Sequence, residues 1–182
     1  MDYHVDTEEF IKRFGDLSRK RFLNRFRVPF LLIEMRGRKK SEGFLSFART
    51  ATKKQPTEAP IRLGGNVVDS LAVPLEKSGR NDFEEMITVG RDAKNDVIIP
   101  HKSVSKFHAV IRREAGDGRM TLGDVGSTNG TELNGELLEE GKAVSLDSGA
   151  RIIFAGSVQA SYFASEEFFD YLKLIQQLQK KG

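Results

Sequence analysis

The sequence predicts a mainly β protein, an antiparallel β-sandwich with an N-terminal helical extension and a C-terminal helix. From residue 71 onward, short apolar segments follow one another closely, and turn residues separate nearly all of them. No helix-period segment lies between them, and Asn134-Gly135 is a signal for a type I′ hairpin because both residues accept positive φ. Many short strands without intervening helices favour a sandwich over a βαβ fold.

The first element is a helix that we expect to begin at Asp6, which supplies an N-cap, and to end at Phe26, before Pro29. Acidic residues occupy its first turn, and apolar side chains recur at helical spacing at Phe10, Phe14 and Leu17. This helix opens a basic N-terminal extension.

The remainder of that extension predicts a hairpin followed by a linker. Residues 29–35 form the first expected strand, residues 36–43 a charged turn and residues 44–47 the partner strand. Residues 50–60 carry lysine and proline and almost no apolar side chains, which is typical of a linker.

The sandwich strands and the last helix come next. The strands are expected at residues 87–90, 97–99, 108–113, 120–124, 142–146, 151–154 and 158–163. Ser165 then caps a helix whose apolar stripe comprises Phe168, Phe169, Leu172, Ile175 and Leu178. We expect this stripe to dock on the sandwich or on the N-terminal helix, and a self-association helix is the alternative.

Composition limits the chemistry. The 182 residues include no cysteine, and the three histidines, His4, His101 and His108, show no metal-ligand spacing. No metal or other cofactor is therefore expected. The chain start lacks a signal-peptide pattern and no apolar run reaches the roughly 20 residues of a membrane span, so we expect a cytoplasmic location.

Charge is unevenly distributed. Residues 1–60 contain 14 Lys and Arg against 8 Asp and Glu, whereas residues 61–182 contain 15 against 18. Such a basic block suits nucleic acid or an anionic lipid, but an interspersed set of charges is more typical of a solvated surface. The absence of a stacking platform and of a helix-turn-helix pattern disfavours nucleic acid as a partner.

Polar groups suited to an anion gather in one stretch of the sequence. Gly90-Arg91 is followed by Ser105-Lys106-Phe107-His108 and then by the run D-V-G-S-T-N-G-T at 124–131. Together they supply a guanidinium, an ammonium, hydroxyls and glycine-flanked backbone N–H groups. Phosphate on a peptide is the ligand that this set suits, because it carries about two negative charges and three acceptor oxygens.

The order of these motifs resembles the forkhead-associated (FHA) domain, a family that binds phosphothreonine peptides. The resemblance covers roughly residues 71–164. We therefore divide the chain into an extension at residues 1–62, an FHA-like sandwich at residues 63–164 and a C-terminal amphipathic helix at residues 165–182.

The resemblance implies a role for each site residue. Arg91, Ser105, Lys106 and Thr128 match positions that contact the phosphate, and Asn129 matches the asparagine that holds the peptide backbone. Lys106 stands where many members have arginine, so positive charge is kept while bidentate geometry is lost. The supporting residues are expected to be Gly90, His108, Gly126, Gly130, Asn134 and Gly135.

Catalysis is disfavoured on two grounds. Ser105 and His108 lack an evident third group to orient the histidine, as a nucleophile and base would need. The run G-S-T-N-G-T has no G-K-[ST] ending and precedes a strand, so it does not match a nucleotide phosphate loop.

The sequence thus predicts a non-enzymatic phosphothreonine-peptide-binding signalling or adaptor module for partners phosphorylated by Ser/Thr kinases. The alternative is a phosphate-independent scaffold that uses an FHA-like fold and its terminal helices. A further hypothesis is self-association, either through those helices or through a phosphorylated N-terminal threonine of the chain itself. The candidate threonines are Thr7, Thr50, Thr52 and Thr57.

Overall fold

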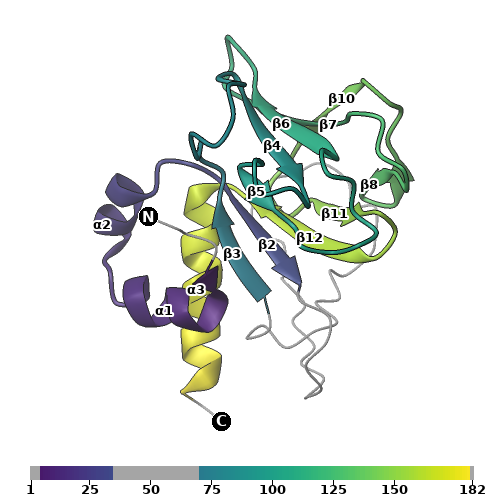
Figure 1. Cartoon of the computed structure of the whole chain (residues 1–182). Helices are drawn as coiled ribbons and strands as arrows, with labels where there is room; N and C mark the ends of the chain where they lie inside the picture. Colours follow the sequence, from purple (N-terminus) through teal and green to yellow (C-terminus); the bar gives the residue numbers. More distant parts are fainter. Residues whose placement is uncertain (1–4, 35–69, 181–182) are drawn as a thin grey trace.

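Two β-sheets face each other in the computed structural model, which describes residues 5–34 and 70–180 (Figure 1). The larger has the order β1-β3-β2-β12-β11-β8-β9 and the smaller the order β10-β7-β6-β4-β5. Neighbouring strands are antiparallel except β4 and β5. The strands are β1 (Val5–Asp6), β2 (Phe30–Glu34), β3 (Ser70–Pro74), β4 (Met86–Gly90), β5 (Val97–Ile98), β6 (Ala109–Arg113), β7 (Met120–Asp124), β8 (Thr131–Leu133), β9 (Glu136–Leu137), β10 (Ala143–Leu146), β11 (Arg151–Phe154) and β12 (Val158–Phe163).

The predicted β-sandwich is confirmed. Strands β7, β11 and β12 have the expected bounds, and the other four expected strands differ by one residue at one end. The core between the sheets contains aliphatic residues from both, such as Ile111 and Leu122 from the smaller sheet and Ile152 from the larger. Alternation along each strand directs these side chains inward.

Strand β2 has a different environment from the one that the sequence predicted. The strand itself is present, but it lies between β3 and β12 and pairs with both. Leu31 and Ile33 face the core between the sheets, whereas Phe30 and Leu32 face the opposite side, where a second core lies. Both faces of β2 are therefore covered by apolar side chains, which explains why its sequence is continuously apolar instead of alternating. The expected turn at 36–43, partner strand at 44–47 and linker at 50–60 lie outside the described residues.

The N-terminal helix is interrupted, contrary to the single helix that we expected up to Phe26. Helix α1 (Thr7–Phe14) begins with the predicted N-cap, since Asp6 accepts hydrogen bonds from the N–H groups of Glu8 and Glu9. Helix α2 (Arg19–Arg25) has its own N-cap, Ser18. At the break, a Cβ on Gly15 would lie 2.5 Å from the carbonyl oxygen of Ile11, so a larger residue would require the backbone to shift, and the side chain of Gln176 from the last helix packs against this glycine.

The three helices enclose a second core on the outer face of the larger sheet (Figure 1). Helix α3 (Ser165–Gln179) docks its apolar stripe there, and of that stripe Phe168, Phe169, Leu172 and Ile175 are buried while Leu178 is exposed. Docking, the favoured expectation, is thus confirmed. Ser165 is not the N-cap, because Ala164 takes that position and the Ser165 hydroxyl donates to the carbonyl of Phe26.

The helical elements are part of the same packed body as the sandwich. Strands β1 and β2 from the predicted extension lie in the larger sheet, and α3 covers it. The division at residues 62/63 and 164/165 stays a prediction. Among the described residues, no helix is long and apolar enough to cross a membrane.

Candidate functional site

Three loops carry the residues that the sequence singled out. Arg91 directly follows β4, Ser105 and Lys106 precede β6, and Thr128 and Asn129 lie between β7 and β8. The backbone N–H of Arg91 donates to the carbonyl of Ser105 at 3.0 Å. The N–H of Thr128 donates to Oγ of Ser105 at 3.0 Å. The structure therefore brings all three loops together around Ser105.

Hydroxyl and amide groups line this meeting point. Oγ of Ser105 and Oγ1 of Thr128 are 3.3 Å apart, so two hydroxyls from different loops face one another. Asn129 donates from Nδ2 to the carbonyl of Ser103 at 2.8 Å, which ties its loop to the one before β6. Its Oδ1 has no partner within residues 5–34 and 70–180 and is available to accept a peptide N–H.

The two cations of the site have no ion-pair partner in the part of the chain that the structure describes. Arg91 and Lys106 are exposed, and neither side chain makes a hydrogen bond or an ion pair with the described part of the chain. Lys77, by contrast, forms an ion pair with the carboxylate of Asp96. An anion that enters between the loops would therefore meet two unneutralised charges.

Gly90 permits the close approach of the first two loops. A Cβ at this position would lie 2.3 Å from the carbonyl oxygen of Lys106, which is too close for any other residue without a shift of the backbone. That carbonyl accepts hydrogen bonds from Nδ2 of Asn95 at 2.6 Å and from the N–H of Asp92 at 3.2 Å. The predicted supporting role of Gly90 has this steric basis.

His108 connects the loops from beneath. Its side chain is fully buried, Nδ1 accepts from the N–H of Ser105 at 3.1 Å, and Nε2 lies 3.2 Å from the carbonyl of Gly130. A backbone N–H can only donate, so Nδ1 is unprotonated and Nε2 carries the proton. Burial lowers the pKa of His108, although the charge of Asp124 and the bond to Gly130 raise it in part.

This arrangement predicts that acid destabilises the protein through His108. The folded-state pKa lies below the ordinary value of 6.5, so the unfolded chain binds the proton first as pH falls. Stability is therefore complete above about pH 6.5 and declines below it. Thermal unfolding between pH 7.5 and pH 5 should show this decline in the wild type and a flatter profile in His108→Gln, which cannot titrate. Identical profiles would contradict the assignment.

Asp124 organises the third loop and was missed by the sequence analysis. Its carboxylate accepts from the N–H groups of Gly126 and Ser127 and from the hydroxyls of Ser127 and Thr131. Burial raises the pKa of Asp124, but these hydrogen bonds outweigh burial and hold the pKa below its ordinary value. Aspartate followed two and three residues later by Gly-Ser is an Asx-turn pattern, and that signal was present in the sequence.

The remaining supporting residues shape turns. Gly126 and Gly130 have φ of 83° and 73°, a region that glycine adopts without strain. Asn134 and Gly135 also have positive φ and connect β8 to β9 as a two-residue hairpin. Oδ1 of Asn134 accepts from the N–H of Arg151, so this residue acts in the fold and does not reach the loops of the site.

Ser105 and His108 are not arranged as nucleophile and base. The histidine accepts from the backbone N–H of Ser105, and it is the hydroxyl of Thr128 that faces Oγ of Ser105. The described residues also contain no group of three or more His, Cys, Asp and Glu that could hold a metal ion. What the geometry offers is a rigid set of donors and cations for an anion.

Comparisons with known proteins agree on this part of the chain. Residues 87–155 match the FHA domain family. The FHA domain-containing protein PS1 of Arabidopsis thaliana is 30% identical over 78 residues, which are 43% of this chain and 5% of that protein. A probable serine/threonine-protein kinase of Dictyostelium discoideum, fhkA, is 35% identical over 84 residues, covering 42% of this chain and 14% of the kinase. The chain thus spans only a small part of the curated relatives that it matches.

Solved structures that resemble this chain include FHA domains. The N-terminal FHA domain of S. cerevisiae Rad53p, in complex with a phosphothreonine peptide, has a TM-score of 0.44 at 24% identity and covers 54% of this chain and 88% of that one. Mycobacterium tuberculosis EmbR, in complex with a low-affinity phosphopeptide, has a TM-score of 0.42 at 24% identity and covers 51% and 21%. The motifs occur in order, the loops that they build meet at one place, and residues 87–155 of this chain match the forkhead-associated domain family.

Proposed function

We propose that this chain binds phosphothreonine peptides at the three-loop site and serves as a signalling or adaptor module for partners phosphorylated by Ser/Thr kinases. The observation that carries the proposal is the pair of cations Arg91 and Lys106, which have no ion-pair partner in residues 5–34 and 70–180, beside the two facing hydroxyls of Ser105 and Thr128. These four side chains would hold the phosphate. Asn129 would hold the peptide backbone through its free Oδ1.

Charge and geometry support a dianionic ligand. A phosphothreonine carries about −1.5 to −2 charge at neutral pH and three strong acceptor oxygens. Arg91 and Lys106 match that charge, and the hydroxyls of Ser105 and Thr128 add donors on loops fixed by His108 and Asp124. Because the loops are held before the ligand arrives, little ordering entropy is lost on binding.

The internal hydrogen bonds of the site also favour binding over catalysis. His108 donates and accepts with backbone groups at both ring nitrogens, so it has no capacity left to move a proton for a ligand. We therefore propose that the domain is not catalytic. We place it in the cytoplasm, where a reader of kinase substrates would meet its partners, and cell fractionation would test that location.

The structure gives less support to the alternative of a phosphate-independent scaffold. The apolar faces of α1, α2 and α3 are buried against the larger sheet and are not available to a partner. Thr7 is fully buried, and its Oγ1 donates to the carbonyl of Ser70 at 2.8 Å, so a kinase cannot reach it in the folded chain. Thr50, Thr52 and Thr57 lie outside the described residues.

Calorimetric titration tests the proposal directly. The purified protein is titrated with peptide pools that carry phosphothreonine, phosphoserine or unmodified threonine at one fixed position. We expect heat of binding from the phosphothreonine pool and none from the threonine pool, because the site provides two cations that only a phosphate neutralises. Equal binding of the phosphorylated and unmodified pools would show that the site does not read phosphate.

A further inference from the structure

Two exposed phenylalanines lie against each other close to the proposed phosphate site. Large apolar side chains are exposed at four positions of the described chain, and two of these are Phe83, at 51%, and Phe107, at 38%. Their rings stack with centroids 5.7 Å apart and an interplanar angle of 23°. The other described phenylalanines are buried or half-buried, so this pair is set apart from both cores.

The pair is continuous with the loops of the site. Phe107 directly follows Lys106 and is two residues from Ser105, so its Cα lies within about 7.6 Å of the Cα of Ser105. An extended peptide advances about 3.3 Å per residue. A side chain about two to four residues from a bound phosphothreonine can therefore reach the aromatic pair.

Both rings are carried on backbone that is already fixed. The N–H of Phe83 donates to Oδ1 of Asn81 at 3.2 Å, and the amide of Asn81 donates to the buried carboxylate of Asp96 at 3.2 Å and to the hydroxyl of Thr88 at 3.1 Å. On the other side, the carbonyl of Lys106 is held by Asn95 and the N–H of His108 by the carbonyl of Val89. Burial of the pair by a partner would therefore cause little further loss of backbone entropy.

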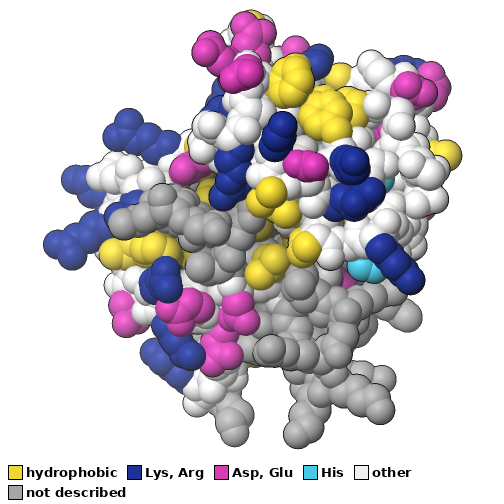
Figure 2. All heavy atoms as spheres, in the orientation of Figure 1, with side chains coloured by type: hydrophobic (Ala, Val, Ile, Leu, Met, Phe, Trp, Pro, Cys, Tyr) yellow, Lys and Arg dark blue, Asp and Glu magenta, His cyan; other side chains and the backbone are white. Residues whose placement is uncertain are grey.

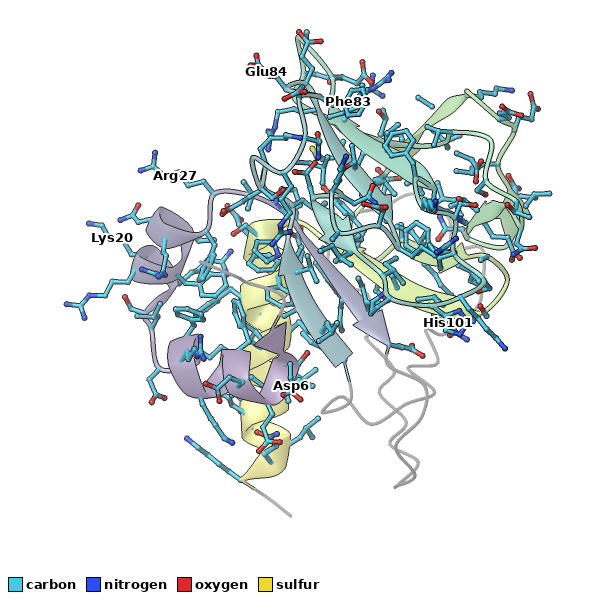
Figure 3. The ribbon with its side chains drawn as sticks, viewed as in Figure 1. Asp6, Lys20, Arg27, Phe83, Glu84 and His101 are labelled. Atoms are coloured by element: carbon cyan, nitrogen blue, oxygen red, sulfur yellow. The ribbon has the colours of Figure 1, made fainter. Side chains whose placement is uncertain are left out.

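The surroundings indicate the kind of group that the pair would accept. Figure 3 shows Phe83 and Glu84 at the top of the view, in the segment that leads into β4. Figure 2 shows apolar rings on this face with basic side chains on one side and acidic ones on the other. The exposed residues next to Phe83 in sequence, Asp82, Glu84 and Glu85, disfavour an acidic side chain there. Exposed aromatic residues at the centre of mixed charge are typical of interaction hot spots.

We infer that Phe83 and Phe107 form an apolar anchor beside the phosphate site, which selects phosphothreonine peptides carrying an aliphatic or aromatic side chain within about four residues of the phosphothreonine. This inference rests on the proposed function and adds to it a second determinant of which peptides bind. The phosphate contacts provide the requirement for modification, and the anchor distinguishes among modified partners by the apolar area that it buries.

The test is a double-mutant cycle between the anchor and the peptide. A library with fixed phosphothreonine and varied flanking positions first identifies the preferred apolar position, and two peptides are then made that differ there as the preferred residue and alanine. We expect the variant F83A/F107A to bind the preferred peptide about tenfold more weakly and the alanine peptide with less than about twofold change, as an anchoring contact requires. Phe107→Leu, which keeps apolar area, should retain most of the preference.

The controls separate this inference from the proposed function. Leu178→Ala removes another exposed apolar side chain, at 43%, on α3 and should change neither affinity. Thermal unfolding checks that each variant folds. A wild-type protein that distinguishes phosphothreonine from threonine but shows no apolar preference, or a variant that loses both peptides equally, would overturn the anchor and leave the function standing. No binding of any phosphothreonine peptide would overturn both.

Discussion

Replacing Arg91 by alanine is expected to weaken binding of a phosphothreonine peptide by about ten- to a hundredfold while the stability of the protein stays unchanged. A hydrogen bond to a charged group contributes about 1.5 to 3 kcal/mol, and each 1.4 kcal/mol is a factor of ten in affinity. Stability is unaffected because the exposed guanidinium makes no hydrogen bond or ion pair with the described residues. Calorimetric titration measures the affinity, and thermal unfolding measures the stability.

Two further variants make this result specific. Arg91→Lys keeps the charge but loses the planar fork, so it should bind more weakly than the wild type and more tightly than Arg91→Ala. Arg151→Ala removes an exposed arginine on β11, where it donates to Gln159, and should leave peptide affinity unchanged. Unaltered affinity in Arg91→Ala would remove this residue from the site. An equal loss in Arg151→Ala would indicate only a general effect of net charge.

The substitution Phe168→Ala is expected to destabilise the whole protein by about 3 to 5 kcal/mol. Phe168 is fully buried and stacks on Phe30 of β2, with ring centroids 4.0 Å apart and an interplanar angle of 16°. Its ring also lies near those of Phe10 and Phe163, so one truncation opens a cavity between α1, α3 and the larger sheet. Chemical denaturation followed by circular dichroism gives the free energy of unfolding.

The stability of Phe168→Ala also tests the role of the terminal helices. A loss of this size is about a fifth or more of the stability of an ordinary domain. Leu178→Ala, on the exposed end of α3, should change stability by less than about 0.5 kcal/mol. If α3 served self-association instead of the fold, Phe168→Ala would leave the unfolding of dilute protein unchanged. Deletion of residues 165–182 would consequently damage the sandwich and could not separate partner binding from folding.

Local patterns were sufficient for much of the site. Arg91 after a strand, Ser105 three residues before His108, and the glycine-flanked Thr128 and Asn129 each have a short-range signature, and loops between strands of one sandwich end up at the same edges. Asp124 also had such a signature. By contrast, the network that connects the buried carboxylate of Asp96 with Lys77, Ser78 and Thr88 joins segments that no local pattern relates.

The sequence by itself determined the class of fold, seven of the strands from residue 86 onward, the capped start of α1 and the order of the motifs, because alternation, turn residues and caps act over a few neighbours. The tertiary structure alone decided that β2 lies inside the larger sheet, that the first helix breaks at Gly15 to pack against α3, and that Phe83 meets Phe107 outside both cores. These outcomes depend on which apolar faces cover one another. An apolar segment such as residues 30–33 could pair with many neighbouring strands. Only the burial of both its faces at once, one in each core, selects a single position in the sheet.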